Sequence, residues 1–221
     1  AFVVGSNHHI KNNKGKGVMI VHMDDIDTRV VTVIGAGVDG KQSILKAIDN
    51  KALVKVVDSS QSKLDDLKSK YGTENVEYIL SSKDSIQVSV NESDLVIGSV
   101  YVVGKEAPKV VTKDMLSSMN PGTVMVDVSI DQGGCFETSK PTTHDSPTFL
   151  ENDIVHYCVT NMPGAVPLTA TEALNKVSLS YVENLANNGI QNALDSDEHL
   201  RNGLNILDGR IVHPGVKEAL E

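Results

Sequence analysis

The sequence lacks tryptophan, and aromatic residues together make up only 4% of its 221 residues. A hydrophobic core must therefore be filled mainly by aliphatic side chains, and valine and isoleucine suit strands because their β-carbons are branched. Hydrophobic residues still account for 40% of the chain, which is enough for one large domain or two small ones. No run of about 18 apolar residues is present, so we expect neither a membrane-spanning helix nor a membrane partner.

Positive charge is scarce, because 20 lysines and arginines face 29 aspartates and glutamates for a formal net charge of -9. Proteins that bind nucleic acid present a basic surface to the phosphates. The basic residues here are scattered, apart from Lys11, Lys14 and Lys16, so we expect no nucleic-acid partner. The first residues also lack the basic, apolar and small-residue segments of a signal peptide, which predicts a cytoplasmic location.

Cysteine is nearly absent, and the two that occur, Cys135 and Cys158, form no Cys-x-x-Cys pair. A zinc or redox motif is therefore not expected, and both thiols are predicted to be reduced and structural. The adjacent His8 and His9 lack the H-E-x-x-H context of a zinc site and are predicted to be solvated. We expect no metal.

Short apolar runs recur at a steady spacing, with helix-like segments between them. Continuous apolar runs are typical of strands buried on both faces, and six are predicted: 30–34, 54–57, 76–80, 95–97, 123–128 and 154–159. Helices are predicted over 41–50, 60–71 and 112–119. This alternation predicts an α/β fold with a doubly wound parallel sheet of Rossmann type.

The segment VVTVIGAGVDG, residues 30–40, places Gly35, Gly37 and Gly40 as G-x-G-x-x-G between a strand and a helix. In this motif the glycines permit a tight turn, a close approach of pyrophosphate and close packing of helix on strand. The pyrophosphate then rests on the helix N-terminus, where free N–H groups favour negative charge. One residue is unusual: Asp39 lies inside the motif, where the helix dipole stabilises a carboxylate but a pyrophosphate would be repelled.

Asp58 ends the second predicted strand, near the expected distance of about 20 residues past the glycines. A carboxylate there can accept both ribose hydroxyls of NAD and would repel the 2′-phosphate of NADP. The motif thus predicts NAD as cofactor; the alternative is a glycine turn followed by a helix-capping Asp58.

Asp131 follows the fifth predicted strand and precedes Gln132-Gly133-Gly134, a backbone that can approach a ligand closely. Its carboxylate could orient water or the ammonium group of a substrate, or it could be a turn aspartate that bonds its own backbone. Asp127 is expected to be the strand-end partner of a loop. His144 with Asp145 could form a catalytic pair, whereas His156 is predicted to support the core.

Three blocks of the sequence resemble alanine dehydrogenases: SDLVIGSVYVVGKEAPKVVTKDML (93–116), NPGTVMVDVSIDQGGCFETSKPTTHDSPTF (120–149) and VHYCVTNMPGAVPLTATEAL (155–174). The resemblance runs from about residue 30 to the end, and IDQGG with NMPGAVP is its most specific part. It implies the reversible, NAD-dependent oxidative deamination of L-alanine to pyruvate and ammonium. The NAD-binding subunit of transhydrogenase shares the architecture but differs in these blocks.

The resemblance also implies which residues hold the cofactor. Asp58 would bind the adenosine ribose, with Lys63 nearby, and Ser81 would contact the adenine end. Val100 and Val128 would line the nicotinamide side.

Two further residues, Asn161 and Met162, would pack near the nicotinamide or its ribose. Asp131 matches the family's catalytic aspartate, at the strand edge where ligands of open α/β sheets bind. The small-molecule partner would be L-alanine or pyruvate, and the family implies a homo-oligomer, specifically a hexamer.

The sequence pattern changes after Pro167. Helices are predicted over 170–187 and 189–194, and a tail that contains several glycines follows them. We assign 1–167 to an NAD-binding Rossmann domain with its N-terminal linking segment. Residues 168–221 are assigned to the helical remainder of an incomplete substrate domain, because some fifty residues are too few for a core of their own.

The sequence departs from the family at its N-terminus. Family members carry an N-terminal segment that supplies an arginine, a lysine and a histidine to the active site. None of these has a counterpart here. The loop 21–27 lacks the family's glycine-rich pattern, and Leu168 replaces a usual basic residue. We therefore expect an N-terminally incomplete alanine dehydrogenase that is inactive by itself. The alternative is a noncatalytic NAD-binding or regulatory protein that has lost the substrate domain.

Overall fold

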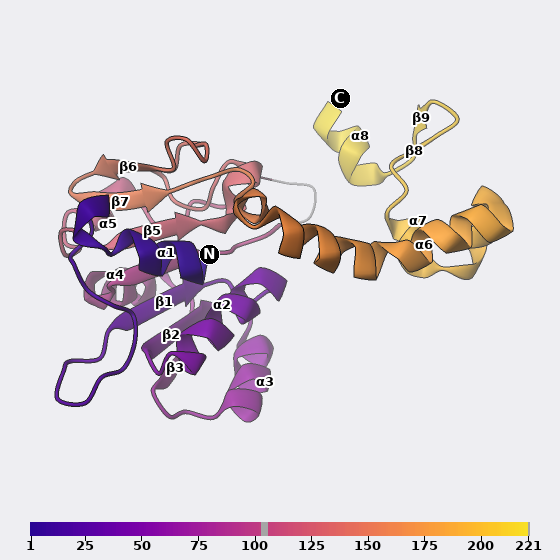
Figure 1. Cartoon of the computed structure of the whole chain (residues 1–221). Coiled ribbons are helices and arrows are strands. Elements are labelled where there is room, and N and C mark those ends of the chain that lie inside the picture. Colours follow the sequence, from indigo (N-terminus) through magenta and orange to yellow (C-terminus); the bar gives the residue numbers. More distant parts are fainter. Residues whose placement is uncertain (103–105, 221) are drawn as a thin grey trace. The chain divides into compact units, whose positions relative to one another are not determined.

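The computed structural model describes residues 1–102 and 106–220, which divide into two compact units (Figure 1). The first unit comprises Ala1–Val102 and Glu106–Met162, and the second contains the described residues from Pro163 onward. The two are described separately.

The first unit is built on a seven-stranded sheet with the strand order β3-β2-β1-β4-β5-β7-β6 (Figure 1). All neighbours pair in parallel except β6, which runs antiparallel to β7. The strands are β1 Val30–Ile34, β2 Leu53–Asp58, β3 Val76–Leu80, β4 Leu95–Gly98, β5 Val124–Asp127, β6 Thr148–Glu151 and β7 Ile154–Tyr157. The six predicted strands and the predicted Rossmann-type fold are thus confirmed, while β6 was not foreseen.

Helices cover both faces of this sheet, because side chains of a strand point alternately to opposite sides. On β1, Val33 packs in a cluster with Ile44 and Leu64, whereas the next residue, Ile34, packs in a second cluster. The helices of the first unit are α1 Phe2–His8, α2 Val38–Asp49, α3 Gln61–Tyr71, α4 Lys83–Glu92 and α5 Lys113–Leu116, with short 3-10 turns η1 Lys11–Asn13 and η2 Val128–Gln132. The sheet is therefore doubly wound.

Local signals explain where several helices begin and end. The hydroxyl of Ser60 accepts from the backbone N–H of Lys63 at the start of α3, and Gly72 ends that helix with a φ of 73°. The predicted helix at 60–71 is confirmed. Helix α4 was not predicted; it begins with a capping box in which Ser82 and Ser85 bond each other's backbone N–H.

The prediction that His8 and His9 are solvated is wrong. Helix α1 packs on the sheet, where it contacts β4 and β5, and this buries His9 completely and His8 partly. The ring of His8 lies 5.2 Å from that of Tyr157. Burial lowers the pKa of His9 to about 4, against an opposing attraction from Asp94.

Cys135 and Cys158 are both free and buried, as predicted. Burial, followed by the nearby Asp127 carboxylate, raises the pKa of the Cys135 thiol well above its usual value and that of Cys158 to about 11. Both are therefore protonated, structural thiols near neutral pH.

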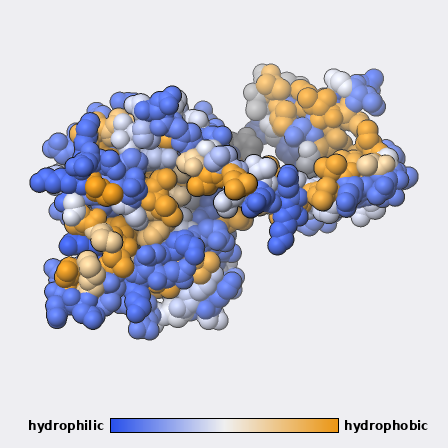
Figure 2. Space-filling view, in the orientation of Figure 1, coloured by the Kyte–Doolittle hydropathy of each residue, from blue (hydrophilic) through white to orange (hydrophobic). Residues whose placement is uncertain are grey.

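The second unit contains few buried side chains. Its elements are η3 Met162–Ala165 at its boundary, α6 Pro167–Ser196, α7 Glu198–Asn202, the antiparallel pair β8 Ile206–Leu207 and β9 Arg210–Ile211, and α8 Pro214–Leu220. Helix α6 is interrupted at Gly189 (φ 73°, ψ 166°), which confirms the predicted pair of helices. Among the described residues after Met162, only Ala193 and Leu194 are buried, and Figure 2 shows apolar side chains on the outside of this unit.

The apolar character of α6 does not make it a membrane helix. No helix among residues 1–102 and 106–220 combines the length and the hydropathy needed to cross a bilayer.

Candidate functional site

The loop between β1 and α2 needs each of its glycines for a different reason. At Gly35 the φ is +98°, and at Gly40 an added Cβ would lie 1.8 Å from the carbonyl oxygen of Gly35. At Gly37, by contrast, an added Cβ would meet nothing within 4 Å. The outer two glycines therefore serve the fold, whereas the space beside Gly37 is left open to a ligand.

Asp58 lies at the carboxyl end of β2, next to this loop, and is 7% exposed. One of its carboxylate oxygens accepts a hydrogen bond from the Ala36 N–H at 2.7 Å, and the other accepts from the Ser60 N–H at 2.8 Å. A carboxylate has about four acceptor positions, so two such bonds leave capacity for ligand hydroxyls. Asp58 thus ties the turn β1–α2 to the turn β2–α3.

A cavity of about 460 Å³ lies in front of this loop. It is lined by five residues predicted from the sequence and five others: Gly35, Gly37, Asp58, Lys63 and Val100, with Val38, Asp39, Ser59, Ser99 and Tyr101. Its volume is within the usual range of ligand sites. The open Gly37, the N-terminus of α2 and the Asp58 carboxylate match the chemistry of a dinucleotide, which presents a pyrophosphate and ribose hydroxyls.

A second cavity of about 210 Å³ shares Asp39, Ser99 and Tyr101 with the first. The remainder of its lining comes from η2, the turn after β5, and includes the predicted Val128 and Asp131. Asp131 is exposed, so its carboxylate is available to a ligand. The two cavities adjoin at the carboxyl edge of the sheet, where ligands of open α/β sheets bind.

The turn that carries Asp131 is held in place by Asp127, which is completely buried at the end of β5. The Asp127 carboxylate accepts from the N–H groups of Ser129 (3.0 Å), Cys135 (2.9 Å) and Phe136 (3.3 Å) and from the Ser139 hydroxyl. Asp127 is thus the strand-end partner of a loop, as expected.

The comparisons with known proteins agree with this geometry. The family model described as "Alanine dehydrogenase/PNT, C-terminal domain" matches residues 1–214. The chain belongs to this family. It is 45% identical over 219 residues to alanine dehydrogenase of Halomonas elongata, a match that covers 99% of this chain and 59% of that protein.

Solved structures show the same relationship. An L-alanine dehydrogenase structure superposes with a TM-score of 0.91 at 39% identity and covers 99% of this chain and 60% of that one. A transhydrogenase structure from Sinorhizobium meliloti shares the fold, with a TM-score of 0.75 at 21% identity over 95% of this chain and 61% of its own. The chain spans about three fifths of the length of the alanine dehydrogenases it matches.

Three residues to which the family resemblance assigns cofactor contacts lie outside the lining of both cavities. The N–H of Ser81 donates to the carbonyl of Asp58 at 2.9 Å, which places Ser81 beside the site. The Asn161 carbonyl oxygen lies 2.7 Å from His144 Nε2, and Met162 packs against the core. Their contacts to a cofactor stay predictions.

Sequence reasoning missed several lining residues, among them Ser99 and Tyr101. These two follow β4 at the same sheet edge, and that position was the signal available. His156 is a core residue, as predicted: it is completely buried, its Nε2 lies 2.8 Å from Thr138 Oγ1, and its ring stacks on Phe149. Burial lowers its pKa.

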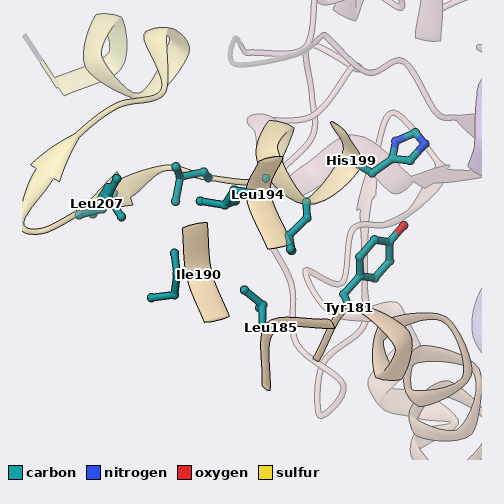
Figure 3. Close-up of a pocket in the computed structure, with 10 residues that line it drawn as sticks. Tyr181, Leu185, Ile190, Leu194, His199 and Leu207 are labelled. Atoms are coloured by element: carbon teal, nitrogen blue, oxygen red, sulfur yellow. The ribbon is translucent and has the colours of Figure 1, made fainter. Parts of the chain in front are cut away.

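A larger cavity, of about 620 Å³, lies within the second unit (Figure 3). Leucine and isoleucine side chains make up most of its wall, including Leu185, Ile190 and Leu194, with Tyr181 and His199 as the polar members. It lacks the charged groups that line the two cavities at the carboxyl edge of the sheet, so it is not the candidate active site.

Among residues 1–102 and 106–220, no group of three or more His, Cys, Asp or Glu side chains is arranged to hold a metal ion.

Proposed function

We propose that this chain carries the NAD site and part of the active site of an alanine dehydrogenase. The reaction would be L-alanine + NAD⁺ + H₂O to pyruvate + NH₄⁺ + NADH + H⁺, in both directions. The observation that carries the proposal is the open space at Gly37, between the N-terminus of α2 and the Asp58 carboxylate.

Within this proposal each wall of the cavity in front of the β1–α2 loop has a role. The free N–H groups at the start of α2 bind the pyrophosphate. Asp58 accepts the hydroxyls of the adenosine ribose with the acceptor positions that Ala36 and Ser60 leave free. When bound, the nicotinamide supplies the acceptor for the hydride of the alanine Cα.

The smaller cavity would receive the nicotinamide and the substrate. Val128 gives it an apolar wall, and Asp131 gives it a carboxylate that can hold the substrate ammonium or orient the hydrolytic water. Because Asp127 accepts hydrogen bonds from Ser129 in this turn and from Cys135, Phe136 and Ser139 in the loop that follows it, Asp131 is presented from a rigid support.

The cofactor assignment is tested by titrating the chain with NADH and NADPH in a calorimeter. We expect NADH to bind more tightly, and Asp58→Asn to reduce that preference by about tenfold or more, since a hydrogen bond to a charged group contributes roughly 1.5–3 kcal/mol. Asp66→Asn, an exposed change on α3, is the matched control. Equal binding of both cofactors by the unmodified chain would overturn the assignment.

The proposal extends to the whole protein. Residues 168–221 would belong to the substrate domain, because α6 exposes large apolar side chains, among them Leu168 (74%), Leu174 (64%) and Val177 (62%). The region of the relatives that this chain does not span would cover them. We further propose a cytoplasmic homo-oligomer, hexameric as the family resemblance implies.

A further inference from the structure

Asp39 is the charged member of the three described residues that line both cavities of the candidate site, with Ser99 and Tyr101. It lies in the first turn of α2, two residues after Gly37. Asp58 lines one cavity and Asp131 the other, so three carboxylates surround the space proposed for the cofactor. Among residues 1–102 and 106–220, Lys63 is the one cationic side chain in either lining.

A carboxylate at this position meets two different charges on the proposed cofactor. The pyrophosphate is negative in both redox forms, so its repulsion by Asp39 weakens NAD⁺ and NADH alike. The nicotinamide ring is cationic in NAD⁺ and neutral in NADH. Only the interaction of Asp39 with the ring therefore differs between the two forms.

We propose that Asp39 is a selectivity residue that favours the oxidised, cationic nicotinamide over the reduced one. The inference rests on the proposed function, and in particular on the nicotinamide entering the cavity that Asp39 and Asp131 share. The Asp39 carboxylate attracts the cationic nicotinamide ring, and the Asp131 carboxylate attracts the same ring.

The position of Asp39 allows its charge to be removed without disturbing the fold. The side chain is exposed, and the backbone carbonyl, not the carboxylate, accepts the hydrogen bond from Ser43 Oγ at 3.3 Å. Removing the charge therefore leaves the hydrogen bonds of α2 in place.

The experiment measures dissociation constants of NAD⁺ and NADH for the unmodified chain and for Asp39→Asn. We expect the ratio Kd(NAD⁺)/Kd(NADH) to rise by about three- to tenfold in the variant, as expected for one partly solvated charge. NADH itself should bind more tightly, because the repulsion of the pyrophosphate is removed. The pyrophosphate contribution cancels in the ratio, so the ratio reports the ring alone.

Two controls support the interpretation. Asp49→Asn removes the same charge at the opposite end of α2, on the order of 15 Å away at 1.5 Å per residue, and should leave the ratio within about twofold, since ion screening weakens charges beyond about 10 Å. The effect of Asp39→Asn should also shrink as ionic strength rises. Asp39→Ser must shift the ratio in the same direction.

The outcomes distinguish this inference from the function on which it rests. If both ligands bind and the ratio in Asp39→Asn stays at the value of the unmodified chain, the selectivity role is overturned while the NAD site stands. If neither ligand binds to the unmodified chain, the proposed function and the inference fall together.

Discussion

Gly37 and Gly40 are three positions apart but differ in what surrounds them, and this difference predicts opposite results for two substitutions. Gly37→Val adds a branched side chain to open space. The variant should fold with a loss of at most about 1 kcal/mol, the typical cost of a poor N-cap residue, and should lose NADH binding.

Gly40→Ala is the contrasting variant, because its Cβ would overlap the carbonyl oxygen of Gly35. It should lower the free energy of unfolding by about 3 kcal/mol or more. Denaturant unfolding and NADH titration of both variants measure these effects. A folded Gly37→Val chain with unchanged affinity for NADH would show that the loop does not hold the phosphates.

His9 predicts a pH-dependent stability. Both of its ring nitrogens are buried without a hydrogen-bond partner in the part of the chain that the structure describes, and its pKa is lowered from 6.5 to about 4. Burial favours the neutral His9 ring, so protonation of this ring favours the unfolded chain. The stability that the neutral ring contributes is complete above pH 6.5 and is lost as the pH falls toward 4. The loss amounts to about 3 kcal/mol at 1.36 kcal/mol per pKa unit.

The corresponding variant is His9→Leu, which should flatten this part of the pH dependence and raise stability at pH 7, since an unpaired buried polar group is costly. Urea unfolding at pH 7, 5.5 and 4.5 measures both effects. His22→Leu, a change at an exposed histidine, should preserve the pH dependence. Parallel pH profiles for the unmodified chain and His9→Leu would contradict the assignment.

At the scale of single elements, the Asp127 carboxylate joins the turn η2 to the loop that follows it. Asp127→Asn replaces an acceptor that receives three backbone N–H groups and the Ser139 hydroxyl. The amide turns a donor toward these donors, so we expect a loss of about 3 kcal/mol or more in the free energy of unfolding. Asp131→Asn, on the exposed side of the same turn, should change stability by less than about 0.5 kcal/mol. Thermal and denaturant unfolding of the two variants measure these changes in stability. Equal losses of stability in Asp127→Asn and Asp131→Asn would contradict the role of Asp127.

The central strands could be predicted from the sequence because burial on both faces leaves continuous aliphatic runs, as in LVIG of β4 and VMVD of β5. Strand β6 leaves no such run, since it is a partly exposed edge strand that follows Pro147. Helix α4 was missed because its capping box uses Ser85 where glutamate or glutamine is the usual signal.

The part of the candidate site that belongs to a motif of fixed spacing could be predicted from the sequence. The glycines and Asp58 follow from a strand–turn–helix pattern whose physics is general. Tyr101 and Ser99 carry no motif of their own, and their place in the cavity follows from strand order, which places β4 next to β1. The burial of His9 depends on how α1 packs, which no local pattern specifies.

At the scale of the whole molecule, the limited coverage of the relatives predicts binding without turnover. The chain spans about three fifths of the alanine dehydrogenases it matches, and the family resemblance implies that the part it does not span supplies the cationic anchors for the alanine carboxylate. Positioning of a bound reactant can contribute about 7–11 kcal/mol to a barrier, and acid–base help about a hundredfold or more. The purified chain should bind NADH and show no alanine-dependent NADH formation.

Fusion of the region of a relative that this chain does not span should restore the reaction, and Asp131→Asn should then abolish most of it. NADH absorbance under saturating alanine follows both steps. Turnover by the 221-residue chain alone, at rates typical of dehydrogenases, would show that another group in this sequence binds the substrate.

The two hydrogen bonds of Asp58 have a consequence for how a ligand is received. Because the carboxylate already joins the glycine turn to the start of α3, the binding surface is organised before any ligand arrives, and little conformational entropy is lost on association. The Ala36 amide should accordingly exchange its hydrogen slowly in the ligand-free chain. A site that is organised before binding needs no slow rearrangement, so association of the ligand should follow a single fast phase limited by diffusion and charge.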